Sequence, residues 1–210
     1  MNITKLTEEY IQSHPSIKDG VQKGLINYSA LTRRIAAEMS LNLKDNFDAI
    51  LIACRRYYQK VKKEAVSEMK ILDILRESKL EVKNKVIVAV VEKDVYFSHI
   101  LELHKSVKSK AELFHVIEGS NSITLITTEE FTADVKKLFK NKVIKLTKAL
   151  AEITLRSSTE LENTPGVVAY LFSLFASHGI NIIETMSTYT DTLFVIDEKD
   201  IAKVLELLHF

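Results

Sequence analysis

The sequence predicts an α+β protein, in which a helical N-terminal region is followed by two βαββαβ units and the second unit lacks a fourth strand of its own. The first supporting observation is the helical spacing of apolar residues through residues 1–66. The second is a change at Lys85 to short β-branched runs, which are typical of buried strands. The third is a return of the same element order at an offset of 65 to 71 residues, which indicates an internal duplication.

Residues 1–66 are expected to form a helical domain, and residues 67–84 to form a linking helix and a short strand. One helix is predicted over Asn27–Met39, with Asn27 as its N-cap. After a polar connection, apolar spacing over residues 46–63 predicts another helix whose opposite face is basic. This basic face is made of Arg55, Arg56, Gln59, Lys62 and Lys63.

Charge is unevenly distributed: +5 over residues 1–63, +2 over residues 64–149 and −6 over residues 150–210. The basic face, with Tyr57 and Tyr58, could contact the phosphates of a nucleic acid in the manner of a helix-turn-helix domain. The alternative is a solvated face of an ordinary helical domain. It is favoured by the length of the polar connection and by the apolar start of the second helix, "FDAILIA". The residues leave both interpretations open.

The first βαββαβ unit is predicted over residues 85–149 and the second over residues 150–210. In the second unit, "AEITLRS" alternates as a strand does, and "GVVAYLFSLFASH" has helical spacing. Only two residues follow the last predicted helix, so the edge of "AEITLRS" lacks the strand that should cover it. We expect either "KLEV" (Lys79–Val82) or a strand of a second subunit to pair there, giving intertwined units and a homodimer.

Pro165 and Gly166 stand out because the chain holds only two prolines and five glycines. Pro165 suits the first turn of a helix, and Gly166 permits another group to approach the backbone closely. The free N–H groups of such a turn favour an anion, for example a carboxylate. Gly179 is the expected helix C-cap, and Asn181 after it offers both a donor and an acceptor. We expect the loop before this helix and the strand after it to lie close together, so that the pair could hold a small molecule that carries a carboxylate and an amine.

The pattern N-x-P-G-V … G-I-N-I over residues 163–182 resembles an ACT domain, particularly those in the regulatory half of aspartokinases. The resemblance covers residues 151–208 and extends to residues 85–149 by element order alone. It implies a ferredoxin-like fold that binds amino acids at interfaces between two such domains and passes the signal to an attached module. The ligand residues that it implies are Asn163, Thr164, Pro165, Gly166, Val167, Asn181 and Ile182.

Two structural interpretations of this motif, which require no ligand, also stay open. The Pro-Gly pair could form a tight turn without a ligand, and Asn181 could bond to the neighbouring loop. The first unit has "EKDVYF" where the second has "NTPGVV", so we expect the first unit to be structural.

No residue pattern points to catalysis, a metal or a cofactor. The six histidines lack metal-ligand spacing. Cys54 lies on an apolar helix face, where a thiol is inert. No carboxylate pair sits in an apolar setting, and there is no Gly-rich phosphate loop. We therefore expect a protein that is not an enzyme and that has no metal site and no cofactor.

The single cysteine, the absence of a signal peptide and the absence of a long apolar run predict a cytoplasmic protein with no membrane partner. The expected function is non-enzymatic regulation, in which a tandem ACT module senses an amino acid. One alternative is an amino-acid-responsive transcription regulator whose helical N-terminal domain binds DNA. Another is a regulatory or structural subunit of a biosynthetic enzyme.

Overall fold

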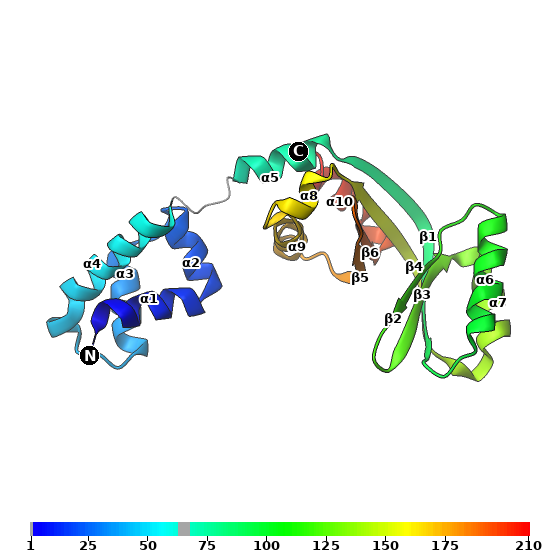
Figure 1. Cartoon of the computed structure of the whole chain (residues 1–210), viewed down its shortest axis with the longest axis horizontal. Coiled ribbons are helices and arrows are strands. Elements are labelled where there is room, and N and C mark those ends of the chain that lie inside the picture. Colours follow the sequence, from blue (N-terminus) through cyan, green and yellow to red (C-terminus); the bar gives the residue numbers. More distant parts are fainter. Residues whose placement is uncertain (1, 63–67) are drawn as a thin grey trace. The chain divides into compact units, whose positions relative to one another are not determined.

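The computed structural model describes residues 2–62 and 68–210, which divide into two compact units, Met1–Glu68 and Met69–Phe210 (Figure 1). The N-terminal unit is helical, and the C-terminal unit combines helices with one sheet, as the sequence predicted. Each unit has buried apolar clusters of its own. Among the described helices, none combines the length and the apolar character that crossing a membrane requires.

The N-terminal unit contains α1 (Ile3–Ser13), α2 (Pro15–Gln22), α3 (Tyr28–Glu38) and α4 (Leu43–Val61). The side chain of Asn27 caps α3 by accepting a hydrogen bond from Ala30 N–H, as predicted. Asn42 caps α4 in the same way, so α4 begins earlier than its apolar spacing suggested. The connection between α3 and α4 is therefore short, Met39–Asn42, and the long polar connection inferred from the sequence is wrong.

All four helices of the N-terminal unit, α1 to α4, contribute to its core. Ile11, Ile35, Ile50 and Cys54 are fully buried there. Tyr57 is 2% exposed and belongs to this core, so the suggestion that it contacts phosphates is wrong. A side chain one position further along a helix turns by about 100°, and Tyr58 is accordingly half-buried beside the basic face.

The C-terminal unit begins with α5 (Glu68–Glu77) and continues as two βαββαβ halves. The first half comprises β1 (Lys79–Glu92), α6 (Phe97–Ser109), β2 (His115–Glu118), β3 (Ser122–Thr128), α7 (Thr132–Phe139) and the start of β4 (Val143–Arg156). The second half comprises the rest of β4, α8 (Glu160–Asn163), α9 (Val167–Ser177), β5 (Ile182–Ser187), β6 (Asp191–Asp197) and α10 (Ile201–Leu207).

All strands join one antiparallel six-stranded sheet in the order β2-β3-β1-β4-β6-β5. Its centre is the pair β1 and β4, which run side by side along their length (Figure 1). The predicted segment Lys79–Val82 pairs with β4 opposite Ile153–Arg156. This confirms that the chain itself supplies the missing fourth strand and that the two halves are intertwined. The open edge that suggested a second subunit is thereby filled.

The sequence had placed a break between "KLEV" and "KVIVAVV" and another between "VIKLTKAL" and "AEITLRS". Both segments are instead continuous strands with irregularities. Lys85 and Ala149 take positive φ angles of 53° and 55°, and the pairing register shifts between Lys83 and Val86. An extra residue in an antiparallel ladder bends the strand while pairing resumes beyond it. Each strand can therefore serve both halves.

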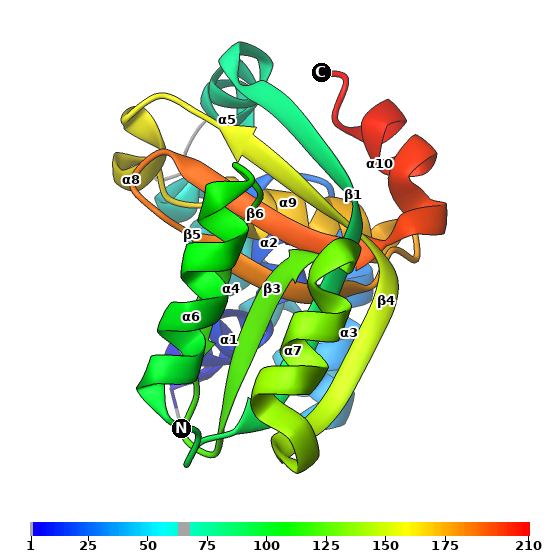
Figure 2. The ribbon, with the colours of Figure 1, turned by 90° about the vertical axis from the view of Figure 1, so that its right-hand side faces the viewer.

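The helices of both halves cover the same face of the sheet. In the first half, α6 and α7 lie together against β1 and β3 (Figure 2). In the second half, α5, α9 and α10 pack on β4 and β6. The opposite face, here called the inner face, is curled, because residues from both edge strands, such as Ile117 of β2 and Met186 of β5, join one cluster. The core of that cluster is Val86, Val88, Ile126, Leu150 and Val195.

Candidate functional site

The Pro-Gly turn connects α8 to α9. Gly166 is the N-cap of α9 and has a φ angle of 99°, a left-handed conformation that residues with a Cβ seldom adopt. Helix α9 begins only at Val167, so Pro165 lies in the turn before the helix. The expectation that Pro165 occupies the first helical turn is therefore wrong. The glycine, rather than the proline, sets the direction in which the helix starts.

Gly166 is closely approached by another group, and that group is Ile71 of α5. A Cβ added at Gly166 would lie 3.3 Å from Ile71 Cδ1, which is closer than most side chains tolerate. Ile71, with two other apolar residues of α5, belongs to the core cluster that includes Val167 and Leu171. Helix α5 thus covers the turn at which the sequence placed a ligand.

Polar groups at the turn lack partners within the described part of the chain. Thr164 is 5% exposed, and its Oγ1 has no hydrogen-bond partner there. No side chain caps the start of α9. The first N–H groups of a helix have no acceptor within that helix, and the helix dipole adds positive potential to them. The turn therefore combines a buried hydroxyl with helix-start donors.

The other end of α9 follows the prediction. Gly179 has a φ angle of 69°, and Ile180 N–H donates to Phe175 O, which closes the helix. Asn181 is exposed, and Ile182 begins β5 opposite Ile196. Among the described residues, no hydrogen bond joins Asn181 to the turn at residues 163–167. The predicted site is thus one structured turn, with Asn181 and Ile182 on a separate segment.

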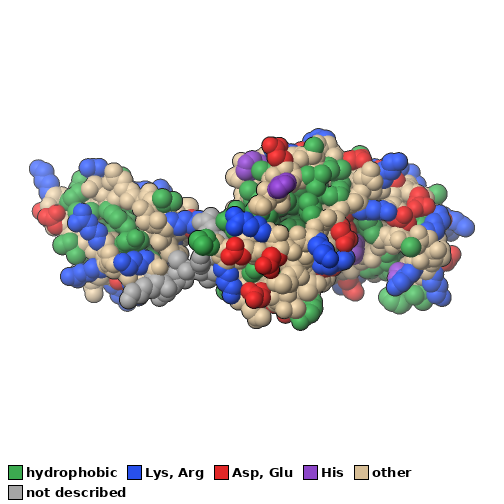
Figure 3. All heavy atoms as spheres, turned by 90° about the horizontal axis from the view of Figure 1, so that it is seen from above, with side chains coloured by type: hydrophobic (Ala, Val, Ile, Leu, Met, Phe, Trp, Pro, Cys, Tyr) green, Lys and Arg blue, Asp and Glu red, His purple; other side chains and the backbone are tan. Residues whose placement is uncertain are grey.

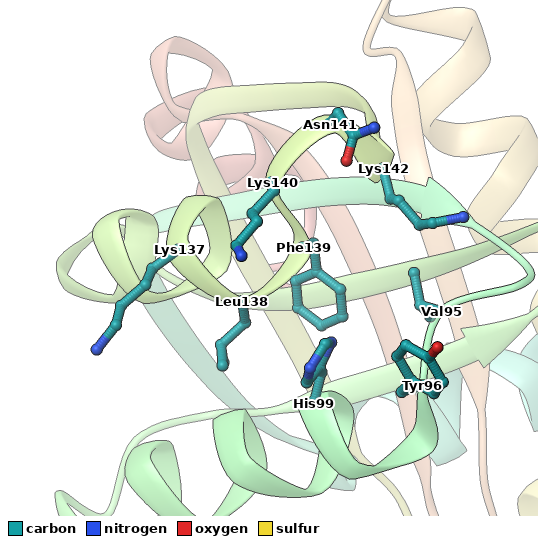
Figure 4. Close-up of a pocket in the computed structure, with 9 residues that line it drawn as sticks. All are labelled: Val95, Tyr96, His99, Lys137, Leu138, Phe139, Lys140, Asn141 and Lys142. Atoms are coloured by element: carbon teal, nitrogen blue, oxygen red, sulfur yellow. The ribbon is translucent and has the colours of Figure 1, made fainter.

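The corresponding turn of the first half borders a hollow of about 410 Å³, shown in Figure 4. Phe139 is its buried floor, and the ring of His99 meets Phe139 edge to face at 6.3 Å. Tyr96, 74% exposed, stands beside His99. In Figure 4, Lys142 points toward Val95, away from Lys137. Sequence reasoning missed this hollow, although "VYFSH" places exposed aromatic residues at a helix start.

The basic face of α4 also borders a hollow, of about 390 Å³. Tyr28, Ile52, Tyr58 and Gln59 line it together with Arg55 and Arg56, and neither arginine has a carboxylate within ion-pair distance among the described residues. The Tyr28 hydroxyl is buried and has no hydrogen-bond partner within the described ranges, and burial raises its pKa.

Lys62 completes the described part of the predicted basic face, since Lys63 lies outside the described residues. The Lys62 ammonium stands 5.7 Å from the centre of the Tyr58 ring. Blue lysine and arginine side chains predominate over red acidic ones on the face of the N-terminal unit seen in Figure 3. Arginine, tyrosine and an exposed Ile52 thus share one surface.

The sequence predicted neither a metal site nor a reactive cysteine. In residues 2–62 and 68–210, no group of three histidine, cysteine or acidic side chains is arranged to hold a metal ion. Cys54 is fully buried, and burial raises the pKa of its thiol to about 11. A thiol with so high a pKa is a poor nucleophile at neutral pH.

Comparisons with known proteins agree with this fold. The family model of the ACT domain matches residues 145–209. No curated protein sequence matches the chain. The chain is similar to the aspartate kinase of Clostridium acetobutylicum, with a TM-score of 0.51 and 14% identity over 62% of this chain and 33% of that one. It is also similar to the regulatory subunit of aspartate kinase from Thermus thermophilus, with a TM-score of 0.50 and 13% identity over 64% of this chain and 96% of that one.

The chain spans only a third of the length of the Clostridium enzyme, and at these identities the structural likeness concerns the fold alone. The match of the family model at residues 145–209 confirms the resemblance inferred from the N-x-P-G-V … G-I-N-I pattern. Residues 145–209 therefore match the ACT-domain family, within a C-terminal unit that has the fold of aspartate kinase regulatory subunits.

Proposed function

We propose that the C-terminal unit is a non-enzymatic sensor that binds a small carboxylate, an amino acid, at the Pro-Gly turn and regulates an attached or associated module. The observation that carries this proposal is the buried Thr164 hydroxyl beside the start of α9, since neither that hydroxyl nor the helix start has a side-chain partner in the part of the chain that the structure describes. A carboxylate would accept hydrogen bonds from that hydroxyl and from the first N–H groups of α9. The other turn residues inferred from the sequence, Asn163, Pro165, Gly166 and Val167, are proposed to border the same ligand, whereas Asn181 and Ile182 lie on a separate segment and are not part of this contact.

Helix α5 supplies the link to regulation. Ile71 lies against Gly166, so a ligand at the turn has to displace this side chain or pack against it. Helix α5 is the first element of the C-terminal unit and follows directly on the segment that joins it to the N-terminal unit. A ligand that shifts α5 changes the point at which the N-terminal unit is tethered.

The test is a thermal-shift screen of the full chain against the twenty amino acids, because a ligand that binds the folded state raises its melting temperature. We expect at least one amino acid to raise the melting temperature of the wild type. Thr164→Val keeps the shape of the side chain, removes the hydroxyl and should abolish most of that shift. Thr159→Val, at an exposed threonine nearby, is the matched control and should respond as the wild type does.

No shift with any amino acid, or an equal shift in Thr164→Val, would contradict the proposal. A shift that persists in Thr164→Val but is lost in a variant of another hollow would place the ligand elsewhere and overturn the site.

A second candidate function is nucleic-acid binding by the N-terminal unit. It is favoured by Arg55 and Arg56, which line a hollow beside tyrosine rings and have no carboxylate partner among residues 2–62 and 68–210. Guanidinium groups bind phosphates in a bidentate way, and aromatic rings stack on bases. The short connection between α3 and α4 removes one objection to a helix-turn-helix arrangement. With this activity, the protein would be an amino-acid-responsive transcription regulator.

Fluorescence anisotropy with mixed-sequence duplex DNA at several salt concentrations tests this candidate. Replacing Arg55 and Arg56 by glutamate should abolish binding, and replacing Lys5 and Lys18 by glutamate, an equal change in charge, should weaken it less. Replacing both arginines by glutamine should reduce the slope of log K against log salt by about 2 if each arginine contacts one phosphate.

Absence of DNA binding at low salt would exclude the transcription-regulator function. Co-purification with a biosynthetic enzyme would then support the remaining alternative, a regulatory subunit.

A further inference from the structure

Charged side chains from several strands meet on the inner face of the sheet. Lys83 of β1 stands opposite Glu152 of β4 in the pairing register, so both side chains lie on the same face. His115 of β2 brings its Nε2 to 3.0 Å from Glu152 Oε2. The Lys83 ammonium lies 2.7 Å from Oε2 of Glu112, just before β2. Together with Thr154 of β4, these residues are called the inner polar cluster.

The carboxylates of this cluster are incompletely hydrogen-bonded. Glu152 is 6% exposed, and the Thr154 hydroxyl donates to its Oε1 at 3.3 Å. Its Oε2 is buried and accepts no hydrogen bond from any described residue, because His115 Nε2 is close enough but is not aligned with it. Oε2 of Glu112 likewise accepts no hydrogen bond from a described residue, because the Lys83 ammonium is close to it but is not aligned. Buried polar atoms are nearly always hydrogen-bonded, so these two oxygens indicate missing donors.

The cluster opens on a hollow of about 340 Å³, and Glu112, Glu152, Thr154 and Lys83 line it. This volume lies in the range of small-molecule sites. Glu81 also lines the hollow, but it is already paired with Arg156 at 3.1 Å. The two carboxylates with spare acceptor capacity are therefore Glu112 and Glu152.

The unused groups define the chemistry of a ligand. Carboxylate oxygens only accept hydrogen bonds, and here two of them stand near a single lysine. A protonated primary amine supplies one positive charge and three donors, which match this need. A metal ion does not fit, because no three suitable side chains within the described ranges are arranged around one point.

We propose that this hollow binds the protonated amine of a small organic molecule, with Glu152 as its principal acceptor and Glu112 as the second. The site lies between the two halves of the sheet and is separate from the Pro-Gly turn. A ligand bound there would link the start of β2, in the first half of the unit, to the part of β4 that belongs to the second half.

Isothermal titration calorimetry of the full chain with n-pentylamine and 1,5-diaminopentane tests the proposal, with 1-pentanol as the neutral control ligand. We expect the amines to bind and the alcohol not to bind. Glu152→Gln keeps the shape of the side chain, removes its charge and should weaken amine binding at least tenfold. Glu118→Gln, on the exposed end of β2, is the matched control and should bind as the wild type does.

Absence of amine binding by the wild type, or equal affinity in Glu152→Gln, would overturn the proposal. If circular dichroism shows that Glu152→Gln does not fold, Glu112→Gln decides: weaker amine binding supports the site, and unchanged binding overturns it. Thr164→Val should leave amine binding unchanged, so failure at this hollow and failure at the Pro-Gly turn are distinguishable.

Discussion

At the scale of single residues, Gly166 combines a left-handed backbone with a close neighbouring side chain. Its φ angle of 99° disfavours most side chains, and a Cβ at this position would lie 3.3 Å from Ile71 Cδ1. Gly179 offers a comparison, because its φ angle is 69° but, apart from the adjacent residues, no described atom lies within 4 Å of the position that a Cβ would take. Replacing each glycine by alanine therefore distinguishes the cost of backbone strain, present at both positions, from the cost of steric contact, present only at Gly166.

Gly166→Ala should lower the free energy of unfolding by about 2 kcal/mol, through backbone strain and contact with Ile71. Gly179→Ala should cost about 1 kcal/mol, from strain alone. Urea unfolding checks both values. A double-mutant cycle of Gly166→Ala with Ile71→Ala should show coupling between the two sites. Strictly additive effects would contradict the close contact between Ile71 and the turn.

Cys54 allows a chemical test of the N-terminal core. Because burial raises the pKa of its thiol to about 11, only about 0.1% of the thiol is ionised at pH 8. Iodoacetamide at pH 8 should therefore modify the native protein far more slowly than the protein unfolded in urea. Mass spectrometry measures the two rates. Rapid modification of the native protein would contradict the burial of this residue.

At the scale of the elements, the exposed face of α9 is unusually apolar. Val168 is 37% exposed and Phe172 is 38% exposed, on a helix whose other face is fully buried. A helix that is apolar all round normally has partners on every side. This exposed apolar face, rather than an open strand edge, supports the predicted homodimer.

Sedimentation velocity at micromolar concentration should therefore detect a dimer, and Phe172→Glu should give a monomer that keeps its fold. Lys203→Glu, an exposed change on α10, is the control and should remain dimeric. A wild type that sediments as a monomer at this concentration would contradict the predicted homodimer.

The sequence predicted most of the elements and their pairing, and its errors have local physical causes. The role of Lys79–Val82 followed from counting the strands that a ferredoxin-like sheet needs, and the pairing register confirms it. The continuity of β1 and β4 was missed because the bends at Lys85 and Ala149 occur at residues other than glycine, which give no local signal. The special backbone of Gly166 was predicted, whereas its cover by Ile71 is a tertiary contact that no local pattern encodes.

At the scale of the whole molecule, shared strands should make the C-terminal unit cooperative. Because β1 and β4 belong to both halves, neither half can lose its central strands alone. Leu103→Ala, in the core of the first half, should destabilise the unit by about 2–5 kcal/mol. Native-state hydrogen exchange should show reduced protection in β6 as well as in β3, and unchanged protection in α3. A loss of protection confined to the first half would contradict this coupling.

The central claim is that a small carboxylate binds at the Pro-Gly turn beneath α5 and thereby acts on that helix. Hydrogen–deuterium exchange of the full chain, with and without each of the twenty amino acids, tests it most directly. One amino acid should slow exchange at the start of α9, over Val167–Tyr170, and alter exchange in α5, over Met69–Glu77. Thr164→Val should lose both effects. Unchanged exchange in these two segments with every amino acid, or changes confined to the inner polar cluster, would contradict it.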